Sequence, residues 1–262
     1  MIERGALGAR PVWGALAVNL ALGGALMAAL VDVPLFARAT VDPSSEVAAA
    51  LVLVRFLIAV PVGAVIGGAL CRTRSRAPLI ASGGMALATA AFVVMASWSA
   101  TAMGGGLRWS DLDLVVCGLG FGLAIAPVNL VVLGSVRPTM HALVSALAVV
   151  ARTIGMLAGL SALTAIALRR FYQAQARIGS PLTLCPAHPA TCPAYDNATT
   201  RALLSELHTI FAGAAVCAAV ACLLALVLLA RSDSGMVGAD GGTFTADAGD
   251  TTRWSAHPRL LD

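Results

Sequence analysis

The chain has 262 residues, of which 59% are hydrophobic and only 11% are charged, and its mean hydropathy is +0.88. Soluble domains have about 45–50% apolar and about 25% charged residues, so this composition excludes an ordinary soluble protein. The net charge is a modest +4, and every basic residue is arginine. The placement of the charges is therefore more informative than their sum.

Six apolar segments are long enough to cross a membrane as helices. Lipid offers no hydrogen bonds to the backbone, so a span must be a helix of about 20 apolar residues or a strand of a closed barrel. These runs are too long and too continuous for barrel strands. We predict an all-α polytopic membrane bundle of six transmembrane helices, at residues 12–31, 47–70, 78–98, 114–134, 142–168 and 208–230. The first run is too long for the core of a signal peptide, which favours a retained span.

Arginine placement predicts the orientation. Arg72, Arg74 and Arg76 lie in the short connection between the second and third spans, and cytoplasmic loops are enriched in basic residues. We therefore expect a plasma (inner) membrane protein with both termini in the cytoplasm. Its organisation would be a cytoplasmic N-terminus (1–11), a six-span bundle (12–231) with an outer loop (169–207), and a disordered cytoplasmic tail (232–262) rich in Gly, Asp, Thr and Ser.

Arg152 is the most informative single residue. It lies about 15 Å along the helix axis from Ala142, near the middle of a hydrocarbon core about 30 Å thick. An arginine at this depth costs at least a few kcal/mol, so it should face a bundle interior or an aqueous cavity and have a partner. Helical spacing places it on one small, polar face together with His141, Ser145, Ala148, Gly155 and Gly159, and we expect His141 and Ser145 to line the same cavity. Either Arg152 serves a transport cavity, or it bonds neighbouring carbonyls and holds the bundle together.

Four further polar residues are candidates for transport or coupling. Asp32 and Arg55 lie toward the outer ends of the first two spans, which are consecutive and antiparallel, so the two side chains are expected to meet there. The alternative is that Asp32 is simply solvated and that Arg55 extends outward to the interface. Asn19 and Asn129 are candidates for a cavity wall, or for hydrogen bonds between helices.

Glycines spaced four residues apart occur three times within the predicted spans and predict faces where helices pack closely. These are Gly63 and Gly67, Gly118 and Gly122, and Gly155 and Gly159. The glycines around Gly118 superficially suggest a phosphate-binding loop, but they sit inside a continuous apolar run with no preceding strand, which excludes that interpretation.

Cys185 and Cys192 share the outer loop, where an oxidising environment would allow a disulfide. A metal site that adds His188 matches no familiar ligand spacing. No span holds a Ser/His pair, a His-x-x-x-His motif or a carboxylate pair suited to hydrolysis. We therefore expect no enzyme activity, no catalytic residues, no cofactor, no metal and no nucleic-acid partner.

Four segments resemble signatures of major facilitator superfamily exporters, at residues 30–36, 55–68, 113–123 and 149–159. Within that superfamily the chain is similar to the fourteen-span drug:proton antiporter branch, and there to actinobacterial exporters of lipids and drugs. The resemblance covers about residues 1–170, and the segment around Arg152 is its most specific part. Two positions depart from the family pattern, because the loop 71–77 lacks an Asp and Arg55 replaces an apolar or aromatic residue.

This resemblance implies the C-terminal six-helix half of a proton-coupled exporter of drugs or of lipidic, amphiphilic substrates. In that family two six-helix bundles rock about a central cavity while protons move inward and the substrate moves outward. We expect the lipid bilayer, protons and an amphiphilic substrate as partners, together with a separate N-terminal half or a homo-oligomer. The alternative is a non-transporting scaffold or assembly subunit, or an inactive truncated remnant.

Overall fold

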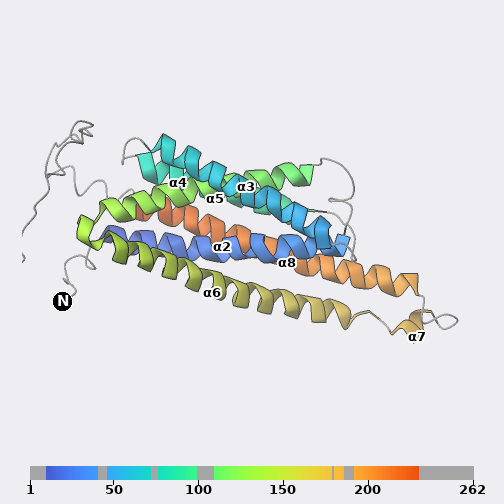
Figure 1. Ribbon diagram of the computed structural model, residues 1–262. Helices are drawn as coiled ribbons and strands as arrows, with labels where there is room; N and C mark the ends of the chain where they lie inside the picture. The colour runs from blue at the N-terminus through green and yellow to red at the C-terminus, as the bar shows by residue number, and fades with distance from the viewer. Residues whose placement is uncertain are drawn as a thin grey trace, which may run out of the picture.

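In a computed structural model of the chain, the described residues are 10–40, 46–71, 76–98, 109–178, 180–185 and 192–229, and no strand occurs among them. The helices are, in chain order, α2 (Arg10–Thr40), α3 (Glu46–Leu70), α4 (Ala77–Met95), α5 (Trp109–Gly134), the 3-10 turn η2 (Pro138–Met140), α6 (His141–Gln175), α7 (Pro181–Leu184), α8 (Pro193–Leu224) and its π-helical end η3 (Ala225–Leu229). Six helices in this part of the chain are long and apolar enough to cross a membrane (Figure 1). The predicted all-α, six-span fold is therefore confirmed.

Several predictions concern segments that lie outside the described residues. These concern the N-terminal residues 1–9, Arg72 and Arg74 in the short connection, and the tail from residue 232 onward. Within the described part, α2 begins and α8 ends at the same end of the bundle, as six crossings require (Figure 1).

The first helix extends well beyond its predicted end at residue 31. α2 continues to Thr40 and includes Pro34 in its interior. The apolar run ends at Asp32, but Phe36 is fully buried one turn further on. Its ring lies 5.3 Å from that of Trp98 and 6.2 Å from that of Phe211, measured between centroids. Aromatic packing against two other segments therefore stabilises the helix past its apolar stretch.

The predicted outer loop, residues 169–207, is mostly helical. α6 has 35 residues and α8 has 32, which correspond to about 52 Å and about 48 Å and exceed a hydrocarbon core of about 30 Å. α8 begins with Pro193 at its first helical position and has Asp196 in its first turn, two features that favour a helix start. Both helices thus extend past the membrane, and only the short connection through α7 separates them.

The helices pack in a defined order around two apolar clusters. α5 packs on α3 and α4, α8 packs on α4 and α2, and α6 packs mainly on α2. One cluster surrounds the rings of Phe56, Phe92, Phe121 and Phe211, and the other lies at the opposite end, around Val12 and Val132. α3 and α6 lie at the edge of the bundle and expose large apolar side chains, among them Val65 at 73% and Leu157 at 60%. Such faces are stable where lipid covers them.

Candidate functional site

Arg152 of α6 binds Asn19 of α2 in the interior of the bundle. Its guanidinium donates from Nη2 and Nε to the amide oxygen Oδ1 of Asn19, at 2.8 and 3.2 Å. The Asn19 amide nitrogen donates in turn to the carbonyl of Ala15, at 3.0 Å, and the side chain is fully buried. Because the amide NH₂ group is held by its own helix, the amide oxygen is fixed toward the arginine.

The depth of this pair matches the middle of a membrane. At a rise of 1.5 Å per residue, Arg152 lies about 16 Å from the start of α6 and Asn19 about 14 Å from the start of α2. α2 and α6 both begin at the same end of the bundle (Figure 1). No carboxylate of the described residues forms an ion pair with Arg152. Its half-buried positive charge is therefore bound by a neutral amide and is not neutralised within this part of the chain.

Small residues bring the two helices close enough for this contact. A Cβ added at Gly155 would overlap the carbonyl oxygen of Leu20, and a Cβ added at Gly159 would meet the backbone of Gly24. These positions follow Arg152 along α6 by one and two turns. The close α2–α6 approach thus depends on glycine, and it sets the distance across which the arginine reaches its partner.

The other two glycine pairs lie between α3 and α5. A Cβ at Gly63, Gly67, Gly118 or Gly122 would lie 3.0 Å or closer to a backbone atom of the facing helix. The two helices therefore pack backbone to backbone, which holds α3 against the rest of the bundle.

Asp32 and Arg55 are not paired in the structure, contrary to the expectation from the sequence. Arg55 instead forms an ion pair with Asp111, in the first turn of α5. Asp32 is 6% exposed and lies near Glu206 of α8. The reason is the packing of the helices, because α3 packs chiefly on α5 whereas α2 packs chiefly on α6 and α8.

Trp98 connects several helices at the end of the bundle where α2 ends. Its carbonyl accepts a hydrogen bond from Nε2 of His208 at 2.6 Å, and because a carbonyl only accepts, Nε2 must carry the hydrogen. The indole hydrogen-bonds to the carboxylate of Asp113. The second oxygen of that carboxylate, Oδ2, is buried without a partner among the described residues.

Neither Asp111 nor Asp113 was selected from the sequence. Both stand at the start of an apolar run, where acidic residues are ordinary helix-initiating residues that interact with the helix dipole. Only the facing side chains, Arg55 and Trp98, distinguish them. The signal that the sequence offers is the pair of carboxylates directly ahead of an apolar span.

The remaining cavity candidates lie apart from Arg152. Ser145 is exposed, whereas His141 and Asn129 are half-buried. Among the described residues, none of the three forms a hydrogen bond with the arginine. The part of the chain that the structure describes also holds no group of three or more His, Cys, Asp or Glu side chains placed to bind a metal.

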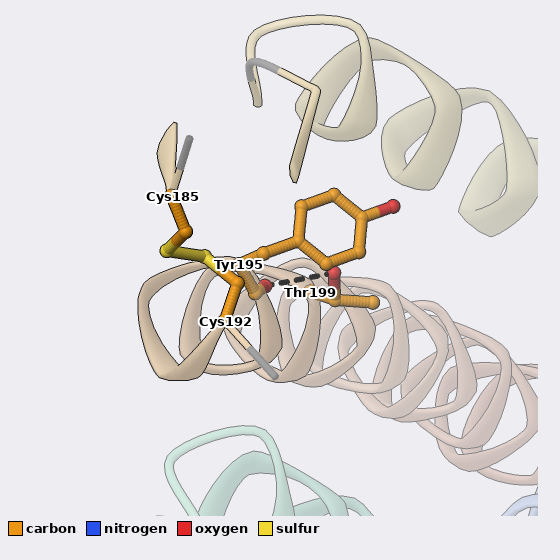
Figure 2. Close-up of a disulfide and its surroundings, with 4 residues drawn as sticks. All are labelled: Cys185, Cys192, Tyr195 and Thr199. Carbon is orange, nitrogen blue, oxygen red and sulfur yellow. Dashed lines mark hydrogen bonds between the residues drawn. A yellow bond between two sulfur atoms is a disulfide. The ribbon is translucent and has the colours of Figure 1, made fainter. Parts of the chain in front are cut away.

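Cys185 and Cys192 form a disulfide between the end of α7 and the start of α8 (Figure 2). Their Cα atoms are 5.7 Å apart. In the turn that follows, the Thr199 hydroxyl donates to the carbonyl of Tyr195 at 3.0 Å. The bond joins α7 to α8 within the connection between α6 and α8.

Cleavage of the full chain with trypsin is expected to show this bond directly. Trypsin cuts after Arg177 and Arg201, so both cysteines remain in the peptide 178–201, which should be two hydrogens lighter without reductant than with it. Losing the bond in a Cys185→Ser variant should cost about 2 kcal/mol locally, because the open connection regains conformational freedom. Because trypsin has no site between residues 178 and 200, the rate is measured with chymotrypsin: the variant should be cut faster after Leu184, next to the former bond, while the rate elsewhere stays the same. Equal cleavage rates would show that the bond contributes nothing to the rigidity of the connection.

Six apolar helices, buried polar pairs between them and a lipid-compatible outer surface define a polytopic α-helical membrane protein.

No family model matches the chain. The chain is similar to a triacylglyceride transporter of Mycolicibacterium smegmatis, at 36% identity over 239 residues, which covers 86% of this chain and 42% of that protein. It is also similar to a triacylglyceride transporter of Mycolicibacterium hassiacum, at 35% identity over 257 residues (92% of this chain and 47% of that protein). A probable triacylglyceride transporter of Mycobacterium leprae matches at 34% identity over 241 residues (89% and 47%). The chain thus spans less than half the length of these relatives.

Proposed function

We propose that the chain is one half of a membrane exporter of lipidic or amphiphilic molecules, and that Arg152 supplies a positive charge to its cavity. The observation that carries this proposal is the arginine held at mid-membrane depth by a neutral amide, with no carboxylate partner among the described residues. A charge in this position costs at least a few kcal/mol. A purely structural contact between α2 and α6 would be made at lower cost by two apolar side chains, so we assign the charge to transport.

The lipidic substrate is supported by the names of the relatives, which are triacylglyceride transporters. A triacylglyceride carries no charge, so we assign Arg152 to proton coupling rather than to substrate binding. The matched relatives are more than twice as long as the matched region, which supports a second six-helix bundle as the partner. With two bundles, the exposed apolar faces of α3 and α6 would border the cavity or the partner half.

Asp32 and Arg55 enter the proposal with separate roles. Asp32 is a buried carboxyl of α2, and the carboxyl of Glu206 on α8 lies near it. We assign Asp32 to proton binding. Arg55 with Asp111 links α3 to α5, and we assign this ion pair to closing that end of the bundle. The arginines of the short connection after α3 support cytoplasmic termini in a plasma membrane.

The test is reconstitution of the full chain in proteoliposomes that contain a fluorescent triacylglyceride. One sample holds the chain alone, and the other also holds the portion of the Mycolicibacterium smegmatis relative that the chain does not match. With a proton gradient imposed, lipid transfer is expected only in the sample that holds both, and it should stop when a protonophore collapses the gradient. If neither sample moves lipid although the two chains co-purify, the chain is a non-transporting membrane subunit and the proposal is wrong.

A further inference from the structure

A polar cleft lies between α6 and α8, where both helices leave the apolar part of the bundle. Its volume is about 230 Å³, and its walls are formed by Arg170, Gln173 and Ala174 of α6, by Arg177 in the turn after α6, and by Ser205 and Thr209 of α8. Neither the coupling role assigned to Arg152 nor the proposed lipid path uses these residues. The cleft is distinct from the Arg152–Asn19 contact, because Arg152 lies 18 residues before Arg170 in α6.

Helical geometry explains why most of these residues gather. Residues 170, 173 and 174 are spaced by three and four, so they share one face of α6, and residues 205 and 209 share one face of α8 in the same way. Arg177 follows in the turn after α6, where its N–H donates to the carbonyl of Ala174 at 3.1 Å. The two helices are in contact. Ser205 donates to the carbonyl of Ala202 at 2.7 Å, and Thr209 donates to the carbonyl of Ser205 at 2.8 Å. Both hydroxyl hydrogens are thus directed to their own helix, and the donors left for a ligand are those of α6 and the turn after it.

The two guanidinium groups are the main donors of the cleft. Within the described residues, the side chains of Arg170 and Arg177 form no hydrogen bond and no ion pair, and both residues are exposed. The carboxylate next to Ser205, that of Glu206, lies near Asp32 of α2. The charge of the cleft lining is therefore positive. Guanidinium groups bind phosphate oxygens through paired N–H donors, a geometry that a single ammonium cannot supply.

The level of the cleft relative to the membrane indicates the source of a phosphate. Arg170 comes almost directly after the apolar residues Ile166 and Leu168, and Thr209 directly precedes Ile210. The cleft therefore begins where the apolar spans end. The polar layer of a bilayer adds about 5–8 Å on each side of the hydrocarbon core, and the seven residues from Arg170 to Arg177 rise about 10 Å. Arg170 thus stands at the base of the polar layer that holds the lipid phosphate groups, and Arg177 stands just beyond its outer edge.

We propose that this cleft binds the phosphate group of a membrane lipid at the surface where α6 and α8 leave the bilayer. Its volume equals that of several water molecules at about 30 Å³ each, which is room for a phosphate and part of the headgroup. The acyl chains remain in the bilayer beside α6. The disulfide of Cys185 and Cys192 joins the end of α7 to the start of α8 and so shortens the connection between α6 and α8. Lipid binding at this site does not depend on whether the chain exports a substrate.

Native mass spectrometry of the full chain in detergent tests the proposal, with phosphatidylglycerol as the probe. The unmodified chain should retain one phosphatidylglycerol, whereas a diacylglycerol with the same acyl chains, which lacks the phosphate, should not be retained. Arg170→Gln and Arg177→Gln should each raise the Kd for phosphatidylglycerol about tenfold, because each removes one charge-assisted contact. The matched control is Arg169→Gln, which removes the same charge from the neighbouring position, about 100° around the helix, and should leave the Kd unchanged.

Three outcomes overturn the proposal. If Arg169→Gln weakens binding as much as Arg170→Gln, the effect is one of net charge and there is no built site. If diacylglycerol is retained as well as phosphatidylglycerol, the protein holds the acyl chains and not the phosphate. If millimolar inorganic phosphate displaces the lipid completely, the cleft binds free phosphate. An intact disulfide in the tryptic peptide that holds both cysteines and an unchanged Tm show that each variant is folded; that peptide is 178–201, or 171–201 in Arg177→Gln, which loses the cleavage site.

Discussion

Replacing Gly155 by alanine is expected to destabilise the bundle by about 3 kcal/mol, although alanine adds a single methyl group. The added Cβ would overlap the backbone carbonyl of Leu20, which has no side-chain freedom with which to move away. α2 and α6 would have to separate, and the reach from Arg152 to Asn19 would lengthen with them. The measurement is the free energy of unfolding of the purified full chain in detergent micelles, by circular dichroism.

The same substitution at Gly68 is the matched control. A Cβ at Gly68 would meet no atom within 4 Å, and the residue lies in a helix of the same bundle. Gly68→Ala should therefore be neutral, or stabilising by up to about 1 kcal/mol through the higher helix propensity of alanine. Equal stability of the two variants would contradict the close α2–α6 packing.

The sequence alone predicts the helical class and the number of spans because both depend on one strong physical requirement. A backbone in lipid must satisfy its own hydrogen bonds, so six long apolar runs become six helices. The ends of the helices are less predictable. Phe36 is helical because of contacts with distant segments, although the apolar run has already ended at Asp32. α8 begins well before the apolar run at His208, because Pro193 and Asp196 favour a helix start there.

Pairs of residues across helices are the least predictable feature. Composition and depth single out Asn19 and Arg152 as individual residues, but 133 positions separate them in the chain. Whether they meet depends on how each helix is rotated about its axis, and helical periodicity within one span does not define that rotation relative to another. For the same reason Arg55, expected beside Asp32, lies beside Asp111. An acidic partner at a helix start, such as Asp111, is especially hard to predict, because an acidic first turn is common in any helix.

Asn19→Leu and Arg152→Met are expected to have opposite effects on stability. Without the amide oxygen, the guanidinium keeps its charge in the interior and loses its acceptor, which should cost about 2 kcal/mol. Removing the charge with methionine, a side chain of similar length, relieves the cost of burying it and should leave the stability equal or higher. The double variant should recover most of the loss seen in Asn19→Leu, because neither polar partner then remains unpaired.

An export assay distinguishes a charge that transport requires from a charge with a structural role alone. In the reconstituted two-chain system, Arg152→Met should abolish proton-driven lipid transfer although the bundle is as stable as before, and Arg152→Lys should retain part of the activity because the charge is kept. The control is Arg169→Met, which removes an arginine from the same helix outside the apolar span. If Arg152→Met unfolds the bundle while Arg152→Lys rescues only its stability, the arginine holds α2 against α6 and has no role in coupling. A folded, stable and inactive Arg152→Met protein would instead show that the chain retains a costly interior charge because transport requires it.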